Sequence, residues 1–210
     1  MPQNTVRQRV GIFGGSFDPI HVGHLLLAEH CREYLGLSQV RFVPAQVSPL
    51  KAEITPTPAK LRVEMTRLAI SGHPSFVVDE RETRRQGVSY TVDTLVELSQ
   101  ELPECELVFL MGADSLNDFD RWRAPEQIVK LARIAVVARG GGAAPKMSIL
   151  QRYLDEASLG MNADDAIIPA PQIEISSSEI RRRVAENRSI RYQVHPSTLA
   201  FIKANQLYVE

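Results

Sequence analysis

The sequence contains little cysteine, almost no net charge and no long apolar run. Its two cysteines, Cys31 and Cys105, form no CxxC pair and no disulfide-framework spacing, so we expect reduced thiols. No segment approaches the roughly 18 consecutive apolar residues of a membrane-spanning helix. The first ten residues also lack the apolar core of a signal peptide. These absences lead us to expect a cytoplasmic protein.

The charge balance excludes a global basic surface. The chain has 24 Lys and Arg against 25 Asp and Glu, a formal net charge of -1. Nucleic-acid binding is therefore not indicated, and any anion site must be built locally. A length of 210 residues and 44% hydrophobic content suit one globular domain. We expect residues 1–210 to form that domain, with 170–210 as a small helical C-terminal part.

Strand-like and helix-like patterns alternate along the chain. Short β-rich runs predict strands at 9–13, 40–44, 75–79, 106–112, 133–139 and 166–169. Helical spacing predicts helices at 22–35, 61–69, 91–102, 125–131, 177–186 and 197–205. Such alternation predicts an α/β fold, a Rossmann-like doubly wound parallel sheet flanked by helices. Ligands bind these sheets where the strand order reverses, so we expect the site at the ends of the first and fourth strands.

Two long connections interrupt this pattern, at 44–58 and 138–146. Irregular segments of that length in a compact domain are more often functional than accidental. The second contains Lys146-Met147-Ser148, which is similar to the start of the KMSKS loop of class I aminoacyl-tRNA synthetases. Ile149 and Leu150 follow where Lys and Ser would be needed. The short chain also leaves no room for a tRNA-binding domain, so we discount this similarity.

The stretch GGSFDPIHVGH, residues 14–24, follows the first predicted strand. Gly14 and Gly15 allow the backbone to approach a bulky anion and, if needed, to take up a positive φ. His21 and His24 fall in the first turn of the next helix, on the same side. A helix N-terminus attracts phosphate, and imidazoles add hydrogen-bond donors there. The stretch therefore predicts a phosphate site.

Three other interpretations of this stretch are weaker. The Gly-Lys-Ser/Thr ending of a Walker loop is absent, and so is the third glycine of a dinucleotide fingerprint. A zinc site would need a third ligand, and His30, His73 and His195 have no suggestive spacing. Solvent-facing histidines on a helix would explain either His21 or His24 alone, but not both after a glycine turn.

A second candidate anion site lies in ISSSEIRRRV, residues 175–184. Ser176 and Glu179 have the spacing of a capping box that opens an amphipathic helix. A serine-rich helix start that faces the sheet would also bind anions, and Arg181 lies in the first turn. The two interpretations are compatible.

These two segments resemble the nucleotidyltransferase motifs GG-x-FDP-x-H-x-GH and I-S-S-T-x-I-R, with Ser178 where threonine is usual. Four further segments, at 41–51, 79–95, 109–128 and 136–139, resemble those of bacterial nicotinate mononucleotide adenylyltransferases in the same order. The segment at 41–51 departs from the PNNxPPHK-type loop at Ala45, Gln46, Ser48 and Leu50, while Lys51 keeps the basic position. The resemblance covers nearly the whole chain.

The resemblance implies adenylyl transfer from ATP to nicotinate mononucleotide, giving deamido-NAD and pyrophosphate in NAD biosynthesis, with Mg²⁺ bound through the ATP phosphates. It implies that His21, His24 and Arg181 are catalytic. It assigns ATP binding to these three and to Gly14, Gly15, Ser16, Phe17, Gly112, Asp114, Arg139, Ile175, Ser176 and Ser178. It assigns mononucleotide binding to Lys51, Ser89, Tyr90, Thr91 and Trp122.

Three of these residues also have a simpler interpretation. Trp122 is the only tryptophan and lies in a polar segment, so it either stacks on a pyridine ring or is a partly buried packing residue. Thr91 begins a predicted helix, where it either helps to bind a carboxylate or is an ordinary cap. Asp114 accepts a hydrogen bond from a ribose hydroxyl or caps the following helix.

Several alternatives stay open at this point. Nicotinamide mononucleotide or phosphopantetheine could replace nicotinate mononucleotide as the acceptor. A non-catalytic adenylate-binding module is the alternative from a different functional class. The expected partners are the two small-molecule substrates, with a homo-oligomer as an open alternative and neither nucleic acid nor membrane expected.

Overall fold

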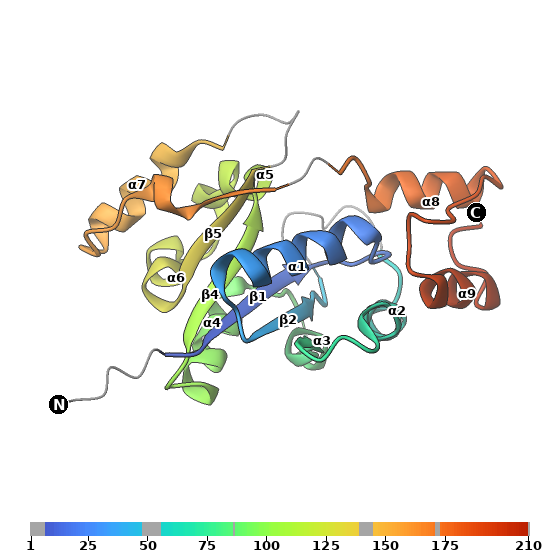
Figure 1. The fold of residues 1–210 in the computed structure, drawn as a ribbon, viewed down its shortest axis with the longest axis horizontal. Helices are drawn as coiled ribbons and strands as arrows, with labels where there is room; N and C mark the ends of the chain where they lie inside the picture. The colour runs from blue at the N-terminus through green and yellow to red at the C-terminus, as the bar shows by residue number, and fades with distance from the viewer. Residues whose placement is uncertain (1–6, 48–55, 86, 139–144, 171–172, 210) are drawn as a thin grey trace.

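The computed structural model describes residues 7–47, 56–85, 87–138, 145–170 and 173–209. The predicted site residues Lys51 and Arg139 lie outside these ranges. Within them, six parallel strands form one sheet in the order β3-β2-β1-β4-β5-β6 (Figure 1). The strands are β1 Arg9–Gly15, β2 Gln39–Pro44, β3 Phe76–Val78, β4 Glu106–Gly112, β5 Arg133–Ala138 and β6 Ile167–Pro169. The predicted α/β class and the parallel sheet are confirmed.

The helices follow the predicted alternation, with one longer addition. They are α1 Val22–Leu35, α2 Ala59–Ile70, α3 Arg81–Arg84, α4 Thr91–Glu101, α5 Ala113–Asn117, α6 Pro125–Leu131, α7 Met147–Glu156, α8 Ser177–Ala185 and α9 Pro196–Ala204, with 3₁₀ turns η1 Phe119–Arg121 and η2 Ala163–Ala166. The sequence analysis did not predict α7, and this omission was an error. Leu150 and Leu154 are four residues apart and bury one face of this helix, and that spacing is visible in the sequence.

Two apolar layers cover the two faces of the sheet. Successive strand residues point to opposite faces, so Phe13 and Leu110 pack toward α1 and α2, while Ile12 and Phe109 pack toward α4 and α6. β4 is buried along most of its length, as expected of a parallel strand covered on both sides. The result is a three-layer arrangement with the sheet in the middle (Figure 1).

The strand order reverses between β1 and β4. These two strands lie side by side, with Ile12 opposite Phe109 and Phe13 opposite Leu110. Their carboxyl ends, at Gly15 and Gly112, therefore open onto the same edge of the sheet, where α1 and α5 begin. This is the edge at which the sequence predicted a ligand site.

The C-terminal helices attach to the side of the molecule that carries α2. α9 packs against α2, and Figure 1 shows α8 and α9 at the same end of the molecule. The backbone N–H of Val22, the first residue of α1, donates to the carbonyl of Gln193 at 2.8 Å. The chain between α8 and α9 therefore contacts the start of the helix that carries the predicted histidines.

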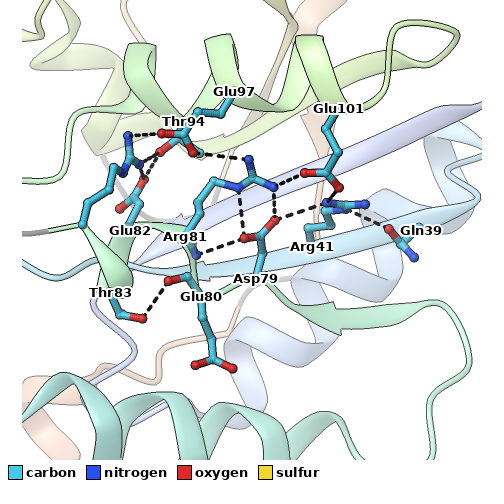
Figure 2. A network of polar contacts seen from close by, with 11 residues as sticks. Gln39, Arg41, Asp79, Glu80, Arg81, Glu82, Thr83, Thr94, Glu97 and Glu101 are labelled. Atoms are coloured by element: carbon cyan, nitrogen blue, oxygen red, sulfur yellow. Dashed lines mark hydrogen bonds and ion pairs between the residues drawn. The ribbon is translucent and has the colours of Figure 1, made fainter.

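A network of ion pairs fixes α3 and α4 against the sheet (Figure 2). Arg81 donates to both carboxylate oxygens of Asp79, at 2.9 and 2.7 Å, and to Glu101 at 2.6 Å. Arg41 of β2 also bridges Asp79 and Glu101, at 3.3 and 2.7 Å. Asp79 follows β3 and Glu101 ends α4, so the network holds α4 in the orientation that presents Thr91 at the ligand edge.

The Asp79 carboxylate should contribute stability that acid removes. Burial alone would raise its pKa, but hydrogen bonds and charge from Arg81, with the charge of Arg41, outweigh burial and hold the pKa below 3.8. A pKa lowered by folding adds stability above the unfolded-state value and loses it as pH falls through the folded-state value. Asp79→Asn should therefore lower the free energy of unfolding by about 3 kcal/mol near neutral pH. The difference from wild type should shrink below about pH 4.

Urea unfolding at both pH values measures this effect. Glu64→Gln is the matched control, because Glu64 pairs with Arg67 at 2.6 Å on the exposed side of α2. That exposed pair should contribute less than about 1 kcal/mol. Equal losses in the two variants, or a loss for Asp79→Asn that persists unchanged in acid, would contradict the assignment.

Candidate active site

The predicted histidines meet at the start of α1. His21 is the N-cap residue, and its side chain is buried, while His24 occupies the third helical position. Their rings stack with centroids 3.6 Å apart and an interplanar angle of 23°. The predicted placement of both imidazoles on one side of the first turn is confirmed.

A hydrogen bond defines which nitrogen of His24 carries a proton in the neutral ring. Nδ1 of His24 accepts from the backbone N–H of His21 at 3.2 Å. The proton of the neutral ring therefore lies on Nε2, which makes Nε2–H a donor. The Phe17 ring packs edge-on against His24, with centroids 5.2 Å apart. Phe17 itself is 2% exposed, so its side chain orients His24 from within the core.

The two glycines of the first loop have different surroundings. Neither has a positive φ; Phe17 adopts one instead, at 48°. A Cβ on Gly15 would lie 2.9 Å from the Phe17 ring, so glycine is needed for the loop to fold back on itself. A Cβ on Gly14 would meet nothing closer than 3.9 Å, which leaves the space beside it open. The positive φ that glycine permits is not used at either position, and the expected room beside the backbone is present at Gly14.

The second motif contacts the first loop directly. Ser177 Oγ donates to the carbonyl of Pro19 at 2.9 Å, and Arg181 Nη1 donates to the carbonyl of Asp18 at 2.7 Å. Arg181 also reaches Ser178 Oγ at 3.4 Å. The structure therefore brings together two motifs that lie about 160 residues apart.

The local details of α8 agree with half of the predicted capping box. Ser176 is the N-cap, and its hydroxyl accepts from the backbone N–H of Glu179 at 3.1 Å. The Glu179 carboxylate pairs with Arg182 and Arg188 rather than completing the box. Ile175, just before the helix, packs against the core layer under α1.

Arg62 of α2 links three segments around the site, and the sequence analysis missed it. Its guanidinium is 1% exposed and donates to three backbone carbonyls. These belong to Ser16 at 2.7 Å, Gln46 at 3.1 Å and Thr57 at 2.7 Å. Burial lowers the pKa of Arg62, against the charges of Asp18 and Tyr208. Its spacing with Met65, Thr66 and Ala69, on the buried face of α2, was the available signal.

A pocket of about 220 Å³ opens beside the first loop. Gly14, Gly15 and Ser16 line one side, and Ser89, Tyr90 and Thr91 line another. Trp122 also lines the pocket, and the apolar lining includes Ile12, Val43, Phe109 and Ile128. All of the described residues predicted for the mononucleotide therefore lie around one cavity that adjoins the glycine loop.

Trp122 is a partly buried packing residue that also lines the pocket. Its ring packs against Phe109 and Phe119, with centroids 5.8 and 5.5 Å away. It also lines the pocket, and its buried Nε1 has no hydrogen-bond partner among the described residues. A buried donor without a partner is costly, so this N–H suits a ligand or water in the pocket.

The cap interpretations of Thr91 and Asp114 are wrong. Tyr90 is the N-cap of α4 and Thr91 is its first helical residue. Gly112 is the N-cap of α5, which leaves Asp114 exposed in the first turn at the carboxyl end of β4. Neither side chain is therefore explained as a cap.

Three further charged residues that line the pocket were missed, Glu82, Arg121 and Arg123. The Arg123 guanidinium lies 4.8 Å from the centroid of the Tyr90 ring and pairs with Asp93 at 3.6 Å. Glu82 is buried at the back of the pocket, where Thr94 Oγ1 donates to it at 2.6 Å (Figure 2). Burial raises the pKa of the Glu82 carboxyl, although Thr94, Arg85 and Ser89 oppose that shift.

Both cysteines are free, and burial raises the pKa of the Cys31 thiol to about 12. None of the helices in the described ranges has both the length and the apolar content to cross a membrane. The described residues also contain no group of three His, Cys, Asp or Glu side chains arranged to hold a metal ion.

Comparisons with known proteins agree with this geometry. Residues 12–183 match the cytidylyltransferase-like family model. A probable nicotinate-nucleotide adenylyltransferase of Rhodopirellula baltica is 46% identical over 95% of this chain and 92% of its own length. One from Thermus thermophilus is 42% identical over 95% and 99%. The Plasmodium falciparum nicotinic acid mononucleotide adenylyltransferase complexed with NaAD has the same fold, with a TM-score of 0.76 at 20% identity over 96% of this chain and 98% of that one.

The fold and the paired motifs define a nucleotidyltransferase of the cytidylyltransferase-like family. Identities above 40% over nearly the whole chain narrow this class further. The chain belongs to the nicotinate-nucleotide adenylyltransferases and is an enzyme of NAD biosynthesis.

Proposed function

We propose that the chain binds ATP against the first loop and α8, binds nicotinate mononucleotide in the Trp122 pocket, and joins them into deamido-NAD with release of pyrophosphate. The observation that carries this proposal is the shared position of Gly14, Gly15 and Ser16. These residues line the pocket together with Ser89–Thr91, and the same loop leads to the stacked histidines at the start of α1. Two ligands bound on either side would meet at the end of β1.

The acceptor phosphate supplies its own nucleophile in this proposal. A phosphate monoester has a second pKa near 6 and is mostly a dianion at neutral pH. Its oxygen attacks the α-phosphorus of ATP in line, the bond to the pyrophosphate oxygen breaks, and no protein base or covalent intermediate is needed. The task of the protein is to bring two polyanions together and to stabilise the leaving pyrophosphate.

The donors that surround the first loop suit that task. We assign His21, His24 and Arg181 to the phosphates of ATP, with Nε2–H of His24 as a hydrogen-bond donor. Ser176, Ser178 and the backbone of Gly14–Phe17 contribute further contacts, with Ile175 supporting the start of α8. Gly112 and Asp114 at the end of β4 lie on the ribose side. Lys51 and Arg139, outside the described residues, would add cations from the two long connections.

The pocket suits a flat aromatic acid. Trp122 would stack on the pyridine ring, and the helix start at Ser89–Thr91 would receive the carboxylate. Arg123 at the pocket adds positive charge on the same side. This favours nicotinate over the uncharged amide of nicotinamide.

Mg²⁺ would be held by oxygen atoms of the ATP phosphates. The carboxylate of the first loop, Asp18, already accepts hydrogen bonds from Thr57 and Tyr208, so the loop offers donors rather than metal ligands. When bound, the ion would offset the negative charge of the phosphates. A cytoplasmic location and a homo-oligomer stay predictions.

Steady-state kinetics with two acceptors tests the substrate proposal. With saturating ATP and Mg²⁺, pyrophosphate release should show a kcat/KM for nicotinate mononucleotide at least about tenfold above that for the amide. That difference corresponds to about 1.4 kcal/mol, the scale of one charge-assisted contact. Preference for nicotinamide mononucleotide, or for phosphopantetheine, would overturn the assignment of the acceptor.

His24→Ala should lower kcat by about 10²-fold or more, the scale of losing one preorganised donor to developing charge. His30→Ala is the matched control, because His30 lies in the same helix and bonds the carbonyl of Pro169 away from the loop. The control should keep turnover near wild type. Normal turnover in a folded His24→Ala variant would remove this histidine from the mechanism.

Trp122→Ala should chiefly raise the KM for nicotinate mononucleotide, because it removes the aromatic wall of the pocket. Loss of a stacked aromatic contact corresponds to about a 2- to 10-fold effect. Comparing KM values for the two substrates separates this role from general damage. An effect confined to ATP would contradict the stacking assignment.

A further inference from the structure

Asp18 of the first loop is a buried carboxylate with partners from distant parts of the chain. It is 7% exposed. Its Oδ1 accepts from the hydroxyl of Tyr208 at 2.7 Å, and its Oδ2 accepts from the backbone N–H of Thr57 at 3.1 Å. Tyr208 lies 190 residues away in the sequence, after the last helix. The C-terminal segment therefore reaches the loop that the two nucleotide motifs share.

The surroundings of Tyr208 keep its hydroxyl protonated, so that it donates this hydrogen bond. Its ring packs against the core layer under α1 and α2, and its hydroxyl lies 3.9 Å from the sulfur of Met65. Burial, together with the charge of Asp18, raises the pKa of the phenol. The hydroxyl therefore keeps its proton at any pH at which the enzyme works, and Asp18 is the acceptor.

The remaining contacts of the loop hold its backbone. Arg181 binds the carbonyl of Asp18, Ser177 binds that of Pro19, and Arg62 binds that of Ser16. The contact from Tyr208 differs because it holds a charged side chain. A shift of Asp18 would move His21, three residues on, and Arg181, which is hydrogen-bonded to it, at the same time.

We propose that Tyr208 is a positioning residue for adenylyl transfer: its hydroxyl fixes the Asp18 carboxylate and thereby aligns His21 and Arg181 with the phosphates of ATP. Tyr208 touches no substrate in this arrangement and acts through Asp18. The proposal rests on the assignment of ATP to the first loop. Tyr208 lies outside both nucleotide-binding motifs, so the proposal gives the C-terminal segment a role in catalysis.

Tyr208→Phe tests the proposal because it removes only the hydroxyl. We expect kcat/KM for ATP to fall by about tenfold, the scale of one hydrogen bond to a charged group. The KM for nicotinate mononucleotide should stay within about twofold, since Tyr208 does not reach the pocket. Tyr192→Phe is the matched control, because Tyr192 lies in the same C-terminal part but is 84% exposed. A lower melting temperature with unchanged constants for both substrates would mean a purely structural role and would overturn the proposal.

A double-mutant cycle with Asp18→Asn tests the route through Asp18. If Tyr208 acts by holding this carboxylate, adding Tyr208→Phe to Asp18→Asn should cause little further loss in kcat/KM for ATP. Multiplying losses would show an independent effect and overturn the route. ATP affinity measured by calorimetry without acceptor separates the two proposals: Tyr208→Phe should weaken ATP binding by about tenfold even if nicotinate mononucleotide proves not to be the acceptor.

Discussion

The site depends on one buried guanidinium. Arg62 lies almost entirely out of water, and an arginine cannot give up its charge, so its N–H groups must find strong acceptors inside the protein. These acceptors are the carbonyls of Ser16, Gln46 and Thr57. The three residues lie in three separate connections of the chain, after β1, after β2 and before α2. The planar fork of donors sets the spacing between these carbonyls, and any rearrangement would leave a buried charge with too few partners.

That constraint joins the two halves of the site. Ser16 belongs to the loop assigned to ATP, and the backbone N–H of Gln46 donates to Ser89 Oγ at 2.9 Å, at the edge of the mononucleotide pocket. A chain of hydrogen bonds therefore runs from the first loop through Arg62 and Gln46 to the start of α4. The ion pairs around Asp79 and Arg81 hold the other end of α4, so the pocket wall is fixed at both ends (Figure 2). Rigid placement of two reactants is what a reaction without a protein nucleophile requires.

The sequence predicted what depends on local pattern. Short β-rich runs and helical spacing placed the strands and most helices, and His21 and His24 could be assigned because their three-residue spacing sets their geometry within one turn. Arg62 and Tyr208 could not be assigned in this way. Arginine and tyrosine side chains usually reach the protein surface, so residue type gave no reason to place these two in the interior. Their partners, Ser16 and Asp18, lie 46 and 190 residues away in the sequence. Only the packing of α2 and α9 on the sheet brings them there. The need for glycine at position 15 could not be predicted for the same reason, since the Phe17 ring that would meet a Cβ there is placed by the core.

The charged and polar groups around the first loop fall into two sets, one that faces the protein interior and one that faces the carboxyl edge of the sheet. Arg62 and the Asp18 carboxylate are buried and hydrogen-bonded within the protein. The stacked imidazoles and the start of α8, by contrast, lie at the carboxyl edge of the sheet. A carboxylate of the first loop that faced the bound phosphates would repel them. Holding Asp18 between Tyr208 and Thr57 turns its negative charge inward and leaves the loop to present donors. A loop with a carboxylate in its sequence can therefore serve as an anion site, because hydrogen bonds from Thr57, just before α2, and from Tyr208, after α9, hold that carboxylate on the inner side of the loop.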